Sequence, residues 1–430
     1  MIIGAVLAMG LPAVAQTNHD FADTLADGKV LLYTVTDQQQ ACVSVRGLWL
    51  DEENPATRYT GALVIPSTVT HDGTQYTVTA IGDSAFTRQD AVTSVSIPPT
   101  VVSIGNIAFH ACSGLTEIVL PEGVQSLGMY AFGHCSAATS LSIPSTLTVI
   151  GRSAFEGLGS PSAPAAVTFN NARCDIGPWG FSAASLSSLD LGTAIRSIGR
   201  AAFSNVFNLQ SVTLPSGMEY VADSVFMYSI FLERVTLPDD MDTLPGSMFE
   251  SCIRLERVEN MPAALLEIGD RAFFECTHLT ELEIPAGVTS IGAEAFRYTQ
   301  MLYDIQSRAA VPPSLGANAL ANVSSMLTVT VPCGSIEAYQ ADSQWGTVDI
   351  VDDCDGVGDV PADGVAVAYD GRTVTVFGAC GEDVSAYDMA GRLMASGMTT
   401  IDASRWPSGI YLLRIRTPMG TALKKLTVAR

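Results

Sequence analysis

Two short stretches of the sequence carry side chains that commonly bind transition metals. His110 lies two residues before Cys112, and Cys276 lies two residues before His278. A zinc site takes three or four such ligands, usually from two close pairs. Neither stretch has a second close pair at zinc spacing, and no C-x-x-C occurs. The sequence therefore predicts no metal and no cofactor, and the five histidines are interpreted as surface side chains.

Nucleophilic catalysis is weakly supported by the residues present. No P-loop, dinucleotide fingerprint, G-x-S-x-G or H-E-x-x-H motif occurs. Asp83-Ser84 and Asp223-Ser224 recur inside a repeated phrase, so we interpret them as turn residues and not as parts of a triad. The segment 157–175 interrupts the repeat with a loop that holds Arg173 and Asp175 but no histidine. We predict no enzymatic activity, and a hydrolase or accessory site in this loop stays as a third hypothesis.

The phrase that carries these residues recurs through most of the chain. Its leading residues are 22 to 26 apart, and its eleven copies share the pattern I-G-x-x-A-F or a close variant. Such regularity is the signature of a stacked-repeat protein. The small Ala is expected to let coils approach each other, and the Gly is expected to permit a tight turn. The copies begin at Ile81, Ile104, Leu127, Ile150, Ile176, Ile198, Val221, Leu244, Ile268, Ile291 and Leu315.

A second phrase, L-x-x-L-x-L followed by proline, lies between the copies. It is clear at 115–121, 209–215, 232–238 and 279–285. Alternating apolar residues predict a short strand with one buried face, and proline ends it because it has no N–H to donate. Stacked coils would bury these apolar residues in continuous columns. The predicted fold is a mainly β repeat solenoid of about eleven coils over 81–351, with caps at 16–80 and at its C-terminal end.

The exposed positions of these strands change character along the solenoid. Early coils present serine and threonine, whereas late coils present charged residues. These make either a solvated face with cross-strand ion pairs or a ligand-binding face. Arginine is favoured at binding hot spots; Tyr130, Tyr228 and Tyr298 on the turn side are alternative anchors. The candidate binding residues are Arg234, Arg257, Glu233, Glu256, Glu259, Glu281 and Glu283.

The cysteines are predicted to be mainly structural. There are nine, so at least one is unpaired within the chain. Four of them follow a repeat Phe by three residues and therefore form one column of buried, small apolar side chains. Parallel side chains in stacked coils disfavour disulfides between them, although such bridges stay an alternative. A Cys333–Cys354 bridge is plausible in an oxidising compartment.

Composition and the chain ends define the setting. The 430 residues include 44 acidic and 22 basic side chains, a net charge of −22, which argues against nucleic-acid binding. Residues 2–15 are an apolar run ending in Ala-Val-Ala, so we expect a signal peptide over 1–15. It is too short for a spanning helix, and no later stretch is long enough. The alternative for this run is a buried N-terminal strand.

The period, the I-G-x-x-A-F phrase and a closing segment with Tyr339 and Trp345 resemble the BspA-like leucine-rich repeat proteins. That resemblance implies a secreted or surface-displayed bacterial protein. Some members are implicated in adhesion to host matrix proteins or to other cells. The matching residues are core residues, so no ligand-binding position is carried over.

The C-terminal region differs from the repeats. After a predicted acidic linker at 352–364, residues 365–430 hold eight basic and five acidic side chains. They read as a small antiparallel β-sandwich. Asp388-Met-Ala-Gly-Arg392, Pro407-Ser-Gly-Ile-Tyr411 and Lys424-Lys-Leu426 resemble the sorting domain of type IX secretion cargo. The resemblance implies the secretion machinery as a partner; an ordinary β-sandwich binding module is the alternative.

Together these observations predict a secreted or surface-displayed leucine-rich repeat protein that binds a macromolecule. The expected partner is a host matrix protein, a mucin or a surface glycan. The alternative is a structural scaffold with no specific ligand.

Overall fold

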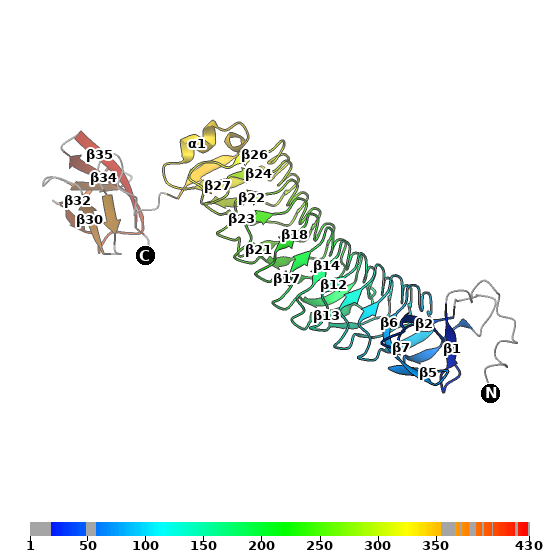
Figure 1. Ribbon diagram of the computed structural model, residues 1–430. Coiled ribbons are helices and arrows are strands. Elements are labelled where there is room, and N and C mark those ends of the chain that lie inside the picture. Colours follow the sequence, from blue (N-terminus) through cyan, green and yellow to red (C-terminus); the bar gives the residue numbers. More distant parts are fainter. Residues whose placement is uncertain are drawn as a thin grey trace. The chain divides into compact units, whose positions relative to one another are not determined.

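The computed structural model describes residues 19–48, 57–353, 366–369, 372–377, 384–388, 391–397, 399–417 and 420–428. The chain divides into two compact units, which are Met1–Thr328 with Thr347–Asp349 and Val329–Gly346 with Ile350–Arg430. The first unit is a β-solenoid of about twelve turns with a period of about 23 residues (Figure 1). This confirms the predicted fold class.

The solenoid begins with a capping sheet. β1 (Phe21–Thr24), β2 (Val30–Asp37) and β3 (Cys42–Gly47) pair antiparallel, and β3 then pairs in parallel with β6 (Thr74–Ile81). β5 (Thr68–His71) forms a hairpin with β6. The ring of Phe21 stacks on Tyr33 and His71 at 5.3 and 4.3 Å. These strands extend the short-strand sheet at its N-terminal end.

Each coil then contributes two strands, one to each of two parallel ladders. The long strands come from the L-x-x-L-x-L phrase, end before its proline where the phrase is complete, as predicted, and fall into four separate sheets along the solenoid. Its strands are β4 (Gly61–Val64), β7 (Val92–Ser96), β9 (Ile118–Val119), β11 (Ser140–Ile143), β13 (Ala165–Phe169), β15 (Leu186–Asp190), β17 (Ser211–Thr213), β19 (Arg234–Thr236), β21 (Arg257–Glu259), β23 (Glu281–Ile284), β25 (Asp304–Ser307) and β27 (Thr328–Val331).

The short-strand ladder comes from the two residues that end at the first position of I-G-x-x-A-F. β6 and the first six of these strands form one sheet, and the last four form another. They are β8 (Ser103–Ile104), β10 (Ser126–Leu127), β12 (Val149–Ile150), β14 (Asp175–Ile176), β16 (Ser197–Ile198), β18 (Tyr220–Val221), β20 (Thr243–Leu244), β22 (Glu267–Ile268), β24 (Ser290–Ile291) and β26 (Ser314–Leu315).

The core between the ladders is built from columns of identical residues. Ten phenylalanines, from Phe86 to Phe296, stack with ring centroids 5.0 to 6.0 Å apart. All ten are buried. A single coil could not shield such a ring from water, so the column exists only because the coils stack.

The glycine of the repeat has a different role from the predicted one. Gly105, Gly128 and Gly151 do not adopt positive φ. A Cβ at Gly151 would lie 2.6 Å from the carbonyl carbon of Gly128, in the preceding coil. The glycine is therefore needed for close approach of backbones. The left-handed turn is made two residues later, by residues such as Ser153, Trp179 and Ala201.

The column three residues after each Phe is filled by small side chains. Cys112, Cys135, Cys252 and Cys276 are buried free thiols, which confirms their interpretation as core residues. Each Sγ donates to the carbonyl of a Phe in the preceding coil, at 3.1 to 3.4 Å. In another coil the Ser229 hydroxyl makes the same bond to Phe203, at 2.9 Å. These five coils therefore use the position for a hydrogen bond between coils, whereas Leu158, Ala184 and Val206 fill it in other coils without one.

The second unit begins at Val329 and contains α1 (Ile336–Ala341), together with most of the 3₁₀ turn η2 (Trp345–Thr347) and of β28 (Asp349–Asp352). Tyr339 and Trp345 are fully buried, and their rings meet edge to face at 5.4 Å. Cys333 is disulfide-bonded. Its predicted partner Cys354, together with nearly all of the predicted linker, lies outside the described residues.

The rest of this unit consists of two antiparallel sheets. One contains β29 (Ala366–Tyr369), β30 (Thr373–Phe377) and β33 (Thr400–Asp402). The other contains β32 (Leu393–Gly397), β31 (Val384–Asp388), β34 (Gly409–Thr417) and β35 (Gly420–Val428). Both sheets contribute to one core around Trp406, as a small sandwich requires. None of the helices in the described residues could cross a membrane.

Candidate functional site

The long-strand ladder places the predicted binding residues on one exposed face. Val235, Val258 and Leu282 point into the core, so their neighbours on either side point outward. Six of the seven predicted residues are exposed, and Glu233 is half-buried. In the register of the sheet Arg234 lies beside Arg257. Two residues further along the strands, on the same outward face, Thr236 lies beside Glu259. We call these seven residues the late-coil patch.

Most charges of the late-coil patch have partners close by. The Arg257 guanidinium lies 2.6 Å from a Glu281 carboxylate oxygen, and both side chains are more than half exposed. Glu283 lies 3.4 Å from Arg308 in the neighbouring strand. Such surface pairs contribute at most about 1 kcal/mol, so they can rearrange for a partner at little cost. Within the described residues Arg234 has no ion pair and lies beside another arginine.

The turn side of the same coils holds a second cluster, with more aromatic surface. The Arg271 guanidinium binds Glu250 through two nitrogens, at 2.7 and 3.1 Å, and Glu294 at 3.0 Å. It also lies 3.9 Å from the ring centre of Phe274, which packs edge-on against Tyr298. The hydrogen bond to Glu250 is the main reason that the pKa of Arg271 is raised.

The three tyrosines named as alternative anchors have separate settings. Tyr228 is 47% exposed, whereas Tyr298 is half-buried beside Phe274 and Arg297. Tyr130 lies in an early coil and packs edge-on against His110. They therefore do not form one patch. Sequence reasoning missed the Arg271–Glu250 pair, because these two turn positions carry side chains of every type in other coils, among them Trp179 and Met227.

The residues considered for metal binding do not assemble into a site. His110 lies beside His134 in the next coil, with ring centroids 5.3 Å apart. Burial lowers the pKa of His110, and His134 lowers it further. Cys112 is committed to its Phe86 bond, and burial raises its thiol pKa to about 12. Across the residues that the structure describes, no three His, Cys, Asp or Glu side chains are placed to hold a metal ion.

The segment 157–175 was expected to be a surface loop, but it contains the buried ladder strand β13, so only its first residues form the loop. Residues 160 and 163 form a tight bridge, and Ala165 begins β13. Asp175 forms a salt bridge with Arg196 and accepts a hydrogen bond from Ser197 at 2.6 Å. Arg173 lies 2.8 Å from Glu219, two coils further on. Both charged side chains of the segment therefore join coils together and are not poised as an acid and a base.

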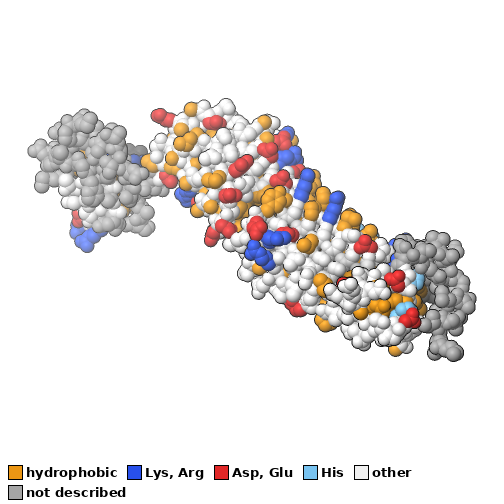
Figure 2. All heavy atoms as spheres, in the orientation of Figure 1, with side chains coloured by type: hydrophobic (Ala, Val, Ile, Leu, Met, Phe, Trp, Pro, Cys, Tyr) orange, Lys and Arg blue, Asp and Glu red, His pale blue; other side chains and the backbone are white. Residues whose placement is uncertain are grey.

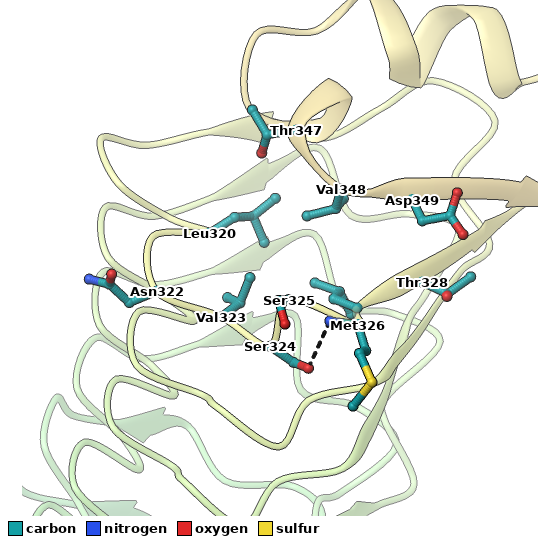
Figure 3. Close-up of a pocket in the computed structure, with 11 residues that line it drawn as sticks. Leu320, Asn322, Val323, Ser324, Ser325, Met326, Thr328, Thr347, Val348 and Asp349 are labelled. Atoms are coloured by element: carbon teal, nitrogen blue, oxygen red, sulfur yellow. Dashed lines mark hydrogen bonds between the residues drawn. The ribbon is translucent and has the colours of Figure 1, made fainter.

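A pocket of about 390 Å³ lies beside the last coil (Figure 3). Leu320 stands there in place of the repeat phenylalanine, so the smaller side chain leaves space. Leu320, Val323 and Val348 face the same space, and Ser324 accepts a hydrogen bond from the Met326 amide at 3.1 Å. Met326 is 69% exposed. Asp349 is the only charged residue among the described ones that line this pocket.

Comparison with known families agrees with the geometry of the coils. The BspA type leucine rich repeat region matches residues 79–164, 174–303 and 258–340, which is more than half of the chain. This chain belongs to the BspA-type leucine-rich repeat family. The residues matched by the family are those that form the repeat phrases, the stacked Phe column and the two ladders. The late-coil patch lies within the matched region, and residues 365–430 lie outside it.

Three solved structures are similar to this BspA-type chain. A leucine-rich repeat protein from Bacteroides ovatus is 22% identical and aligns over 75% of this chain and 98% of its own, with a TM-score of 0.34. A leucine-rich cell surface protein from Faecalibacterium prausnitzii is 20% identical, over 77% and 98%, with a TM-score of 0.37. The pneumococcal vaccine antigen PcpA is 15% identical, over 78% and 99%, with a TM-score of 0.39. No curated protein matches the chain.

One feature of this BspA-type solenoid was missed from the sequence altogether. The short-strand ladder stops at β18 and restarts at β20, and a groove of about 670 Å³ lies there. The signal in the sequence is Pro245, which stands where other coils have glycine.

Figure 2 shows acidic and basic side chains in small groups on one face of the molecule.

Proposed function

We propose that this BspA-type protein is displayed on the surface of a bacterial cell and binds a macromolecule through the late-coil patch. One observation carries the proposal. Arg234, which has no ion pair within the described residues, lies beside Arg257 in the register of an exposed parallel sheet. Arginine presents a planar set of donors that suits carboxylate and sulfate groups. The expected ligand is a matrix protein, a mucin or a surface glycan that carries such groups.

The proposed mechanism is binding without chemistry. The ligand lies across the coils, and its anionic groups replace Glu281 as the partner of Arg257 while also engaging Arg234. Glu233, Glu256, Glu259 and Glu283 surround these arginines and repel anions that do not match their spacing, so they would set specificity. The protein acts as an adhesin-like module and not as an enzyme.

Export is proposed to depend on both ends of the chain. The apolar run at 1–15 would act as a signal peptide, and residues 365–430 as a type IX sorting domain. Gly391 adopts φ +77° in the Asp388–Arg392 turn, and the Asp388 carboxylate accepts a hydrogen bond from the Arg392 amide at 2.9 Å. Lys425 is exposed on β35. Replacing Lys424 and Lys425 by alanine should leave the protein inside the outer membrane, which surface proteolysis of whole cells measures.

The binding proposal is tested with the full chain on immobilised matrix proteins, mucins and glycans. The double variant Arg234→Glu/Arg257→Glu should lose saturable binding by about tenfold or more, since each charged hydrogen bond contributes about 1.5–3 kcal/mol. Arg200→Glu reverses one arginine at an exposed turn residue, so it is the charge-matched control for the single variants Arg234→Glu and Arg257→Glu. Equal binding by the wild type and the double variant would remove the patch from consideration.

A structural scaffold without a specific ligand is the second candidate. The observation in its favour is that Arg257 and Glu283 already have partners within the sheet. Absence of saturable binding to every ligand class would support this candidate, and the pairs would then serve only to hold coils together.

A further inference from the structure

The short-strand ladder is broken at one coil interface. At regular interfaces two backbone amides of each coil donate to the coil before it, as Gln125 does to Val102 and Gly128 to Ile104, both at 2.8 Å. Between β18 and β20 neither equivalent bond is present. The carbonyls of Glu219 and Val221 accept no hydrogen bond within the described residues. In Figure 1 this gap lies in the green part of the solenoid, between β18 and β22.

A proline accounts directly for the missing bond to Val221. Pro245 occupies the position of the repeat glycine and has no N–H, so it cannot bond to the Val221 carbonyl. The gap affects only this corner of the coil. On the turn side Phe226 still donates to Met248 at 2.9 Å, and on the long-strand side β19 still pairs with β21. The coils therefore remain stacked, and the opening is a fixed slot.

The charged groups that line the slot are all hydrogen-bond acceptors. The two free carbonyls lie on one side, and six carboxylates line the groove without any basic side chain among the described lining residues. Tyr220, also in the lining, is 63% exposed. The carboxylates are those of Glu219, Asp223, Asp240, Asp242, Glu267 and Asp270.

The carboxylates are not all engaged by the protein. Glu219 is paired with Arg173, and Asp240 accepts from the Gly217 amide at 2.7 Å. Asp223 and Asp270 also accept from backbone amides of the next coil, at 3.0 and 2.6 Å. The side chains of Asp242 and Glu267 are exposed and make no hydrogen bond or ion pair within the described residues.

We propose that this slot binds an extended, arginine- or lysine-rich segment of a partner protein. Guanidinium and ammonium groups donate hydrogen bonds and accept none, so they match a lining of carbonyls and carboxylates. The coils stay stacked, with Phe226 and Phe249 6.0 Å apart, so no further strand fits between them, and the Glu219 and Val221 carbonyls would accept from the guanidinium or ammonium side chains of the segment. Tyr220 offers a ring face for a cation beside them. This partner differs from the anionic ligand proposed for the late-coil patch and binds the other ladder.

The test measures binding of a fluorescein-labelled peptide of alternating arginine and valine to the full chain, by fluorescence anisotropy at physiological salt. Pro245→Gly restores the repeat residue and its N–H, so the ladder should close while every carboxylate remains. We expect this variant to lose peptide affinity by about tenfold or more, as for the loss of one or two charged hydrogen bonds. Hydrogen exchange at the backbone amide that the substitution introduces reports whether the ladder has closed.

Two further variants keep the outcome decisive. Asp242→Asn/Glu267→Gln should also lose about tenfold, whereas Glu117→Gln/Glu337→Gln removes the same charge at exposed residues outside both sites and should bind the peptide like the wild type. A peptide with citrulline in place of arginine should not bind. Equal affinity in wild type and a ladder-closed Pro245→Gly, or equal loss in both double variants, would show nonspecific attraction to an acidic protein and overturn the slot.

The two proposals fail independently. Loss of matrix or glycan binding in Arg234→Glu/Arg257→Glu concerns the late-coil patch alone. Loss of peptide binding in Pro245→Gly concerns the slot alone.

Discussion

Two coil interfaces differ in the residue at the second position of the repeat phrase. One has glycine, at Gly128 and Gly151, and its short-strand ladder is closed. The other has Pro245, and its short-strand ladder is open. At the first, glycine lets the backbones approach and its amide completes the ladder. At the second, proline leaves two carbonyls open and a groove beside them. The Phe column nevertheless continues, with Phe226 and Phe249 6.0 Å apart. The Phe column therefore does not depend on every hydrogen bond of the short-strand ladder. The coils stay stacked where those bonds are absent.

The largest expected effect tests whether the core is indeed continuous. Phe155→Ala, in a regular coil, and Phe226→Ala, beside the gap, should each lower the free energy of unfolding by about 3–5 kcal/mol, because both rings are fully buried. Denaturant unfolding measures both variants. A much smaller loss for Phe226→Ala would mean that the gap extends into the core.

A smaller effect tests the packing difference at the two interfaces. Gly151→Ala should lower the free energy of unfolding by about 1–3 kcal/mol, because its Cβ would lie 2.6 to 2.7 Å from atoms of the preceding coil. Gly246→Ala at the open interface meets nothing closer than 3.4 Å and should change stability by about 0.5 kcal/mol or less. Thermal unfolding of the two variants compares them directly, and equal losses would contradict close approach as the role of the repeat glycine.

The smallest effect concerns ion pairs that join regular coils. The hydrogen bond from Arg196 lowers the pKa of Asp175 below its ordinary 3.8, and Ser197 adds to this. A lowered folded-state pKa stabilises the protein above the unfolded value, and the contribution disappears as the pH falls through the folded value. Asp175→Asn should therefore reduce the unfolding midpoint at pH 7, and the difference from the wild type should shrink as the pH falls below 3.8. A midpoint difference that persists at low pH would indicate packing and not charge.

The sequence was sufficient for the repeating part of the structure because the same residues recur in each coil. Ile104, Phe109 and Cys112 occupy buried columns as their spacing predicted. The outward orientation of Arg234, Arg257 and Glu281 followed from strand alternation in the same way. Each of these inferences needs only a period of about 23 residues and a period of two within strands.

The misjudged features depend on contacts between coils. The glycine was expected to make the turn, but the left-handed residues are Ser153 and its equivalents, and such positions accept almost any side chain here. The Arg271–Glu250 pair joins residues on different coils, and its geometry depends on how the turns stack. Pro245 was visible in the sequence, yet its effect on the ladder depends on which carbonyl its missing N–H would have reached.

The sequence by itself therefore determined the stacked coils, the buried columns and the outward face of the long strands, because hydrophobic periodicity fixes which side of each segment avoids water. Only the tertiary structure decided which charges neutralise each other and where the ladder opens. Both depend on distances between atoms about 23 residues apart, and backbone hydrogen bonds between coils set those distances.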